Sequence, residues 1–256
     1  MKKKIIALCL IVALAATAVI GGTLAYFTDT DAETNTFTVG GVKIDLIETD
    51  RHGNDFEQGQ CLMPIVGSAQ GEKDETGNPI AKNYIDKIVT IKNTGSSAAY
   101  VRAYFAIPSD LDDGKETFNA GANILHFNFG NANGATTYQN QWKWTHDGKW
   151  NYFETTIDDV AYNVYFADYY QPLPAKATTE QFVSGVYLDN HVDMKNGKYI
   201  DTRYPEADLS ILKGTVSCPV KAVAVQADGF NSVAAAVDAA FGAQFNPFGG
   251  TVTNWQ

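Results

Sequence analysis

Apolar and polar residues alternate with a period of two over most of the chain beyond residue 25, and turn-forming residues interrupt this alternation at short intervals. Alternate side chains of a strand point to opposite faces, so the pattern predicts strands with one buried face. Residues 98–107 are the clearest example, because five apolar side chains share one face: Ala99, Val101, Ala103, Phe105 and Ile107. The spacing of such segments predicts a sandwich or barrel of antiparallel strands.

Other alternating segments are predicted as strands at residues 88–92, 160–166, 181–188 and 211–225. Near the start, residues 36–39 and 42–46 flank Gly40 and Gly41, and they form either two strands around a tight turn or one strand with a glycine bulge. Two polar stretches, 110–137 and 189–205, are predicted as long surface loops. The Asn196-Gly197 pair marks a turn within the second loop.

An aromatic-rich hairpin is predicted at residues 142–152. A three-residue loop at 146–148 would place four large rings on one buried face, whereas a two-residue Asp-Gly loop would scatter them. We therefore expect the longer loop and a core position for these rings, rather than an exposed platform for sugars: Trp142, Trp144, Trp150 and Tyr152.

One short helix is predicted near the end of the chain, at residues 232–241. Asn231 can cap its start and Gly242 can end it. Apolar residues recur at helical spacing, which predicts that one stripe of the helix docks on the sheet: Phe230, Val233, Val237 and Phe241.

Residues 1–25 have the layout of a cleavable export signal. Three lysines precede sixteen uncharged and largely apolar residues at 5–20, and mostly small residues follow up to Ala25. The apolar run is shorter than the ~20 residues of a membrane-spanning helix. We expect cleavage between Ala25 and Tyr26, so that only the uncleaved precursor is held at a membrane and residues 26–256 form a single secreted domain.

Loss of the leader leaves 16 basic and 29 acidic side chains, a net charge of −13. This charge argues against nucleic acid as a partner, because nucleic-acid binding relies on basic side chains. Two cysteines, Cys61 and Cys218, also remain after cleavage. They are either a disulfide, which an oxidising compartment permits, or two unpaired thiols.

The polar residues of the sequence carry no recognisable catalytic or metal-binding motif. The four histidines are scattered and none belongs to an H-E-x-x-H helix, so we expect no zinc site. Residues 110–114 resemble the start of a calcium loop, but the glycine comes one position early and the closing glutamate is missing. The acidic group Asp29, Asp31 and Glu33 is more typical of a solvated face. We expect no catalytic residue, metal or cofactor.

The sequence around the expected cleavage site resembles a known family. Residues 21–29 (GGTLAYFTD) and 35–40 (NTFTVG) are similar to the signal and mature start of the TasA and camelysin family, and residues 91–96 with 99–102 resemble its first core hairpin. Members are exported in Gram-positive bacteria by a signal peptidase of the SipW type. The resemblance implies a secreted or cell-surface protein with a jelly-roll-like sandwich.

For the best-known members, the resemblance further implies biofilm-matrix fibres in which each subunit lends an N-terminal strand to the next. Here the donor segment would be residues 26–39, with Phe37 and Val39 as its apolar residues. The partners would be other copies of the chain and other matrix or cell-surface components. Camelysin is described as a metalloprotease, which is one alternative; a monomeric surface adhesion protein is the other.

Overall fold

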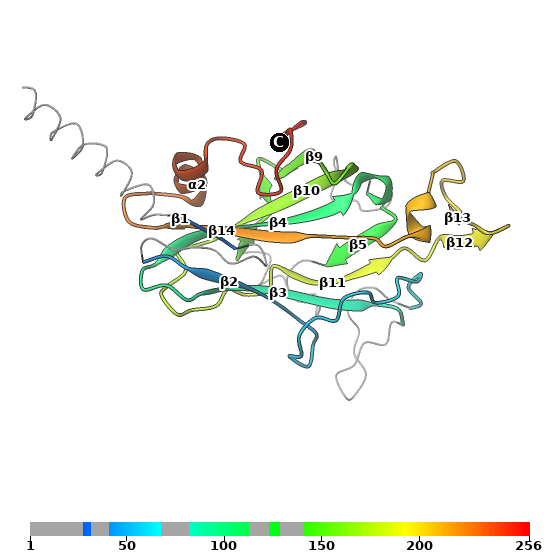
Figure 1. The fold of residues 1–256 in the computed structure, drawn as a ribbon, viewed down its shortest axis with the longest axis horizontal. Coiled ribbons are helices and arrows are strands. Elements are labelled where there is room, and N and C mark those ends of the chain that lie inside the picture. The colour runs from blue at the N-terminus through cyan, green and yellow to red at the C-terminus, as the bar shows by residue number, and fades with distance from the viewer. Residues whose placement is uncertain (1–27, 32–40, 68–81, 113–122, 129–140) are drawn as a thin grey trace, which may run out of the picture.

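The computed structural model describes residues 28–31, 41–67, 82–112, 123–128 and 141–256. Two antiparallel sheets lie face to face in this part of the chain, and one short helix, α2 (Val233–Phe241), covers the outer face of the larger sheet (Figure 1). The predicted all-β sandwich with a short C-terminal helix is confirmed. Strands of alternating polarity need such a partner layer, because each buries its apolar face only against another element.

The larger sheet has the strand order β1-β14-β4-β10-β6, and β9 also pairs with β10. All of its pairings are antiparallel. The side chains predicted for the buried face of residues 98–107 all lie in the core between the sheets, so that prediction is confirmed. The strands are β1 (Thr28–Asp31), β4 (Ala99–Pro108), β6 (Trp142–Lys143), β9 (Tyr152–Ile157), β10 (Val160–Tyr169) and β14 (Val220–Gln226).

The smaller sheet has the order β2-β3-β11-β5. Its last strand lies inside the stretch that was predicted as a surface loop, and this prediction is wrong at residues 124–128. Ile124 and Leu125 are buried, because their apolar side chains reach the core beside β11. The strands are β2 (Ile44–Thr49), β3 (Ile85–Asn93), β5 (Leu125–Asn128) and β11 (Val183–Leu188).

The second predicted loop, 189–205, is also corrected. It contains a hairpin of β12 (Val192–Lys195) and β13 (Lys198–Asp201), which projects from one end of the sandwich (Figure 1). The turn at Asn196 and Gly197 is confirmed, with φ angles of 52° and 74°. The predicted strand 211–225 begins late, because its first residues belong to a 3-10 helix, Ser210–Lys213.

The aromatic hairpin has the two-residue loop that we did not expect. β7 (Thr145–His146) pairs with β8 (Lys149–Trp150), and Asp147 and Gly148 form the turn with positive φ angles. All four rings are nevertheless buried in the core between the sheets, because β6 joins the larger sheet while β7 and β8 form a separate ribbon. Burial of the rings is therefore confirmed, but the register that we used to explain it is wrong.

A second apolar cluster lies on the outer face of the larger sheet. Val233, Ala236 and Val237 of α2 are buried there, so the docking of the helix is confirmed. The N-cap is Ser232, whose side chain accepts a hydrogen bond from the Ala235 N–H, and not the predicted Asn231. Gly242 ends the helix with a φ of 92°. The larger sheet is therefore buried on both faces, which alternation alone did not predict.

A charged pair lies within this doubly buried sheet. Arg102 of β4 donates from Nε to Asp168 Oδ1 at 2.6 Å and from Nη2 to Oδ2 at 3.0 Å. Its guanidinium also lies 4.7 Å from the centre of the Phe166 ring. Because Arg102 is only 4% exposed, the carboxylate of Asp168 is what makes its burial tolerable.

Candidate functional site

The first candidate site is the β14 edge of the larger sheet. β1 pairs with β14 in antiparallel register, from Thr28 opposite Val225 to Asp31 opposite Ala222. β1 is the outermost strand on that side, so its residues close an edge that β14 would otherwise present (Figure 1). The strand falls within the predicted donor segment 26–39. The cleavage residues Ala25 and Tyr26 and the donor residues Phe37 and Val39 lie outside the described residues.

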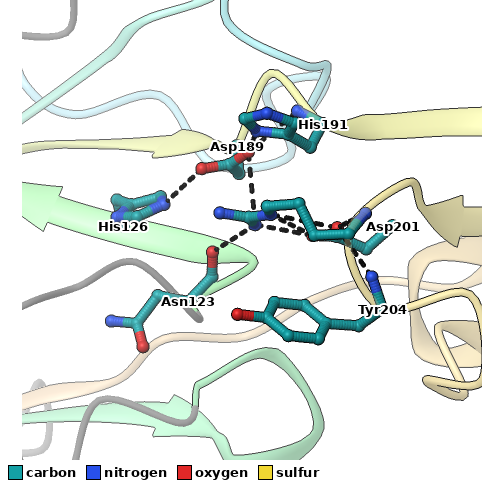
Figure 2. Close-up of polar contacts among 7 residues, drawn as sticks. Asn123, His126, Asp189, His191, Asp201 and Tyr204 are labelled. Carbon is teal, nitrogen blue, oxygen red and sulfur yellow. Dashed lines mark hydrogen bonds and ion pairs between the residues drawn. The ribbon is translucent and has the colours of Figure 1, made fainter.

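The second candidate site is a polar cluster where the β12–β13 hairpin meets the sandwich (Figure 2). Asp189 is at its centre. Oδ2 of Asp189 lies 2.9 Å from His126 Nε2, and Oδ1 lies 2.8 Å from His191 Nδ1. The guanidinium of Arg203 lies 3.3 Å from the same Oδ1. One carboxylate thus joins strand β5, the start of the hairpin and the segment after it.

Arg203 extends this cluster to the end of the hairpin. Its Nη2 donates to Asp201 Oδ2 at 2.6 Å and to the carbonyl of Asn123 at 3.2 Å. The backbone N–H groups of Arg203 and Tyr204 also donate to Asp201 Oδ1, at 2.7 and 3.3 Å (Figure 2). The side chain of Asp201 is fully buried. Its negative charge is therefore satisfied entirely within the protein.

Both carboxylates of the cluster are held ionised. Burial alone would raise the pKa of Asp189, but hydrogen bonds from His191 and His126 and the charge of Arg203 outweigh it, and the pKa is lowered. For Asp201, the hydrogen bonds from the Arg203 side chain are the main cause of its lowered pKa. The same contact raises the pKa of Arg203. The cluster is therefore charged on both sides at neutral pH.

His126 and His191 are the one pair of histidines that the structure brings together, and the sequence did not show this. They are 65 positions apart, and the shared partner Asp189 follows a strand that carries no motif. The ring of His126 is buried and stacks on Tyr187 at 4.9 Å and 7°. His52 lies in a turn and His146 at the end of β7, and both side chains are exposed, as expected for histidines outside a site.

The chemistry of this cluster does not suit a metal ion. Two imidazole nitrogens and a carboxylate are ligands that zinc accepts, but the cationic Arg203 lies against the carboxylate and would repel a second cation. Among the described residues, no group of three His, Cys, Asp or Glu side chains is arranged to hold a metal ion. The donors therefore do not fit a catalytic metal, and their geometry suits a clamp that fixes the hairpin base.

Cys61 and Cys218 are not joined to each other in the structure. Cys61 is exposed, whereas burial raises the pKa of the Cys218 thiol to about 12. In the calcium-like segment, Asp112 is buried and accepts a hydrogen bond from the Tyr165 hydroxyl at 2.7 Å. Residues 113–114 of that segment lie outside the described part.

The fold and its edge define a class: an antiparallel β-sandwich whose N-terminal strand lies on a sheet edge. A family model described as "Camelysin metallo-endopeptidase" matches residues 1–51, which include the expected export signal, β1 and β2. This match confirms the resemblance to the TasA and camelysin family in the N-terminal region and supports a relationship to exported proteins. Comparison with curated proteins gave no match, and neither did comparison with solved structures.

None of the helices in the described part of the chain has the length and the apolar character that crossing a bilayer requires.

Proposed function

We propose that the mature chain is a secreted structural subunit that polymerises by exchange of its N-terminal strand, in an extracellular matrix or at a cell surface. The pairing of β1 with the edge of β14 carries this proposal. A strand that pairs with an edge of its own chain can pair with the same edge of another copy, because both contacts are chemically identical. Exchange is then favoured by high protein concentration.

The composition of β1 supports exchange. Its sequence, Thr-Asp-Thr-Asp, offers main-chain pairing but no apolar side chain to bury. By contrast, β14 is already secured without β1, because it pairs with β4 over seven residues and its central side chains are fully buried. The acceptor edge should therefore remain folded when β1 leaves, which strand exchange requires. The apolar donor residues Phe37 and Val39 would extend the transferred segment.

The family description favours a metalloprotease as a second candidate function. The described residues that most resemble a metal-binding group are His126, His191 and Asp189. The cationic Arg203 lies against the Asp189 carboxylate and opposes the binding of a metal ion there. We therefore propose that the mature protein has no protease activity of its own. Purified protein beginning at Tyr26 should leave casein intact with and without added zinc, whereas cleavage that a chelator abolishes would favour the enzyme.

A paired substitution in β1 tests the assembly proposal. Successive N–H groups of a strand point to opposite sides, so one of any two neighbouring residues in β1 must face β14. Replacing Asp29 and Thr30 together by proline removes that donor whatever the register, whereas Asp29→Ala/Thr30→Ala keeps it. The alanine pair removes the same side chains and one charge, so it is the matched control.

We expect protein beginning at Tyr26 to form filaments, visible by electron microscopy and light scattering, in the wild type and in the alanine pair. The proline pair should remain monomeric. Filaments of equal length in the proline pair would contradict the role of β1. A wild type that stays monomeric at all concentrations would instead favour the monomeric surface protein.

A further inference from the structure

The C-terminal residues close another edge of the larger sheet, that of β9. Glu154 N donates to Thr253 O at 2.8 Å, and Thr253 N donates back to Glu154 O at 3.0 Å. Gln256 N donates to Tyr152 O at 2.9 Å, and Tyr152 N donates to Gln256 O at 3.4 Å. Without these bonds, the outward N–H and C=O groups of two β9 residues would form an open template for another strand.

A local bulge lets this C-terminal segment bury an aromatic ring. Glu154 and Tyr152 are two residues apart in β9, but their partners Thr253 and Gln256 are three residues apart in the C-terminal segment. The segment therefore contains one extra residue, next to Asn254, whose φ is 51°. Asn254 Nδ2 donates to Glu154 Oε2 at 2.6 Å. The bulge turns Trp255 onto the sheet, where it stacks on Phe153 at 5.1 Å and 11°.

The approach to the edge is fixed as well. The buried hydroxyl of Thr155 lies 3.1 Å from the carbonyl of Thr251 and accepts a hydrogen bond from Asn246 Nδ2 at 2.9 Å. Gly250 has a φ of 81°, and a Cβ there would lie 2.9 Å from the carbonyl of Thr156. Only glycine allows the chain to pass this close to β9.

From this geometry we infer that residues 251–256 guard the β9 edge against strand addition by a second copy of the chain. Release of the segment would expose both the open main chain of β9 and the ring of Phe153. A second copy fits this surface, because two identical β9 edges can pair antiparallel about a two-fold axis and cover each other's rings. The guard thus leaves β14 as the edge at which the proposed strand exchange takes place.

Two variants of the otherwise complete mature chain test this inference. Thr253→Pro removes the N–H that donates to Glu154 O, whereas Thr253→Ala keeps it. The threonine side chain is exposed, so both variants lose the same solvent-facing group. A chain that ends at Gly250 removes the segment altogether. A synthetic peptide with the sequence of residues 251–256, added in trans, should occupy the vacated edge, and a peptide with alanine in place of Trp255 should bind more weakly.

We expect Thr253→Pro and the shortened chain to form lateral pairs. If the wild type is filamentous, single filaments become paired or bundled; if it is monomeric, sedimentation shows dimers. Thr253→Ala should match the wild type, and the peptide should reverse pairing of the shortened chain. This readout does not need filaments, so it distinguishes failure of the guard from failure of the proposed function.

The inference is overturned if both released variants keep the wild-type association state while retaining the near-ultraviolet circular dichroism of a packed core. The segment would then stabilise the sheet without guarding it. If the shortened chain does not fold, the comparison of Thr253→Pro with Thr253→Ala decides. Pairing that the peptide leaves unchanged would also contradict the inference, because the second copy would then be bound elsewhere.

Discussion

Two edges of the six-stranded sheet are covered by terminal segments of the same chain, but by different means. At β14, the covering strand is four polar residues long and contributes main-chain pairing. At β9, the C-terminal segment combines main-chain pairing with the stacked ring of Trp255, and its Thr251 carbonyl accepts a hydrogen bond from the buried hydroxyl of Thr155 in β9. Burial of apolar surface is the larger source of stability, so the N-terminal closure should exchange more easily than the C-terminal one.

The largest effect on stability is expected at the centre of the larger sheet, where Arg102 of β4 pairs with Asp168 of β10. Arg102→Ala leaves the carboxylate of Asp168 largely buried without its partner, and we expect it to lower the free energy of unfolding by about 3–5 kcal/mol. Urea denaturation followed by tryptophan fluorescence measures this loss. The double variant Arg102→Ala/Asp168→Ala should lose less than the sum of the two single variants, and strict additivity would contradict the coupling.

Removal of the aromatic anchor should have the next largest effect. Trp255 is half-buried, so Trp255→Ala should lower the free energy of unfolding by about 2–3 kcal/mol, below the range for a fully buried tryptophan. Trp255→Phe keeps a ring against Phe153 and should cost less than half as much. If the two variants unfold at the same denaturant concentration, stacking does not secure the C-terminal edge.

The polar cluster at the base of the β12–β13 hairpin is a third region to compare with the two edges. It is held by the charges of Asp189, Asp201 and Arg203 and not by strand pairing. The lowered pKa values of Asp189 and Asp201 mean that their ionised forms stabilise the fold above the unfolded pKa of about 4. This contribution is lost as the pH falls through the lower, folded pKa. Hydrogen exchange should therefore show the β12–β13 hairpin opening in acid before β9 does.

A variant isolates the contribution of one carboxylate to that clamp. Asp189→Asn removes the charge that the two histidines and Arg203 share, and it should cost about 1–2 kcal/mol at neutral pH. It should also weaken the acid dependence of hairpin exchange. An unchanged pH profile would show that Asp201 alone produces the effect.

The smallest effect on stability is expected at the N-terminal edge. The proline pair at Asp29 and Thr30 should lower the free energy of unfolding by only about 0.5–1 kcal/mol, the net contribution of the one main-chain hydrogen bond to β14 that it removes. It should nevertheless abolish assembly. A large loss of stability, measured by urea denaturation at low protein concentration, would show that β1 is an integral strand and not an exchangeable one.

The sequence predicted most of the long strands and failed at short or interrupted elements. Alternation located β3, β4, β10 and β11, and caps located α2 to within a residue. β5 was missed because its four residues are too short for a periodic signal and lie between polar stretches. The two-residue turn was rejected because we assumed that β6 and β7 form one continuous strand.

The candidate sites were predictable in different degrees. The N-terminal segment was indicated by its position behind the expected export signal, and a motif resemblance supported it. The clamp could not have been predicted, because its residues come from three separate segments and none belongs to a spaced motif: Asn123 and His126, Asp189 and His191, and Asp201 with Arg203 and Tyr204. The C-terminal guard left one signal in the sequence, an aromatic residue in a tail rich in turn formers.

The covalent connectivity of assembled protein tests the central claim most directly. Asp29 and Ala224 lie opposite each other in the register of β1 and β14, so cysteines at both positions, with Cys61 and Cys218 replaced by serine, can form a disulfide across this edge. If strands are exchanged, filaments oxidised after assembly will give a ladder of covalent multimers on a non-reducing denaturing gel, and dilute protein will give cross-linked monomers. Filaments that yield cross-linked monomers alone would show that each β1 stays on its own chain, and they would contradict the account.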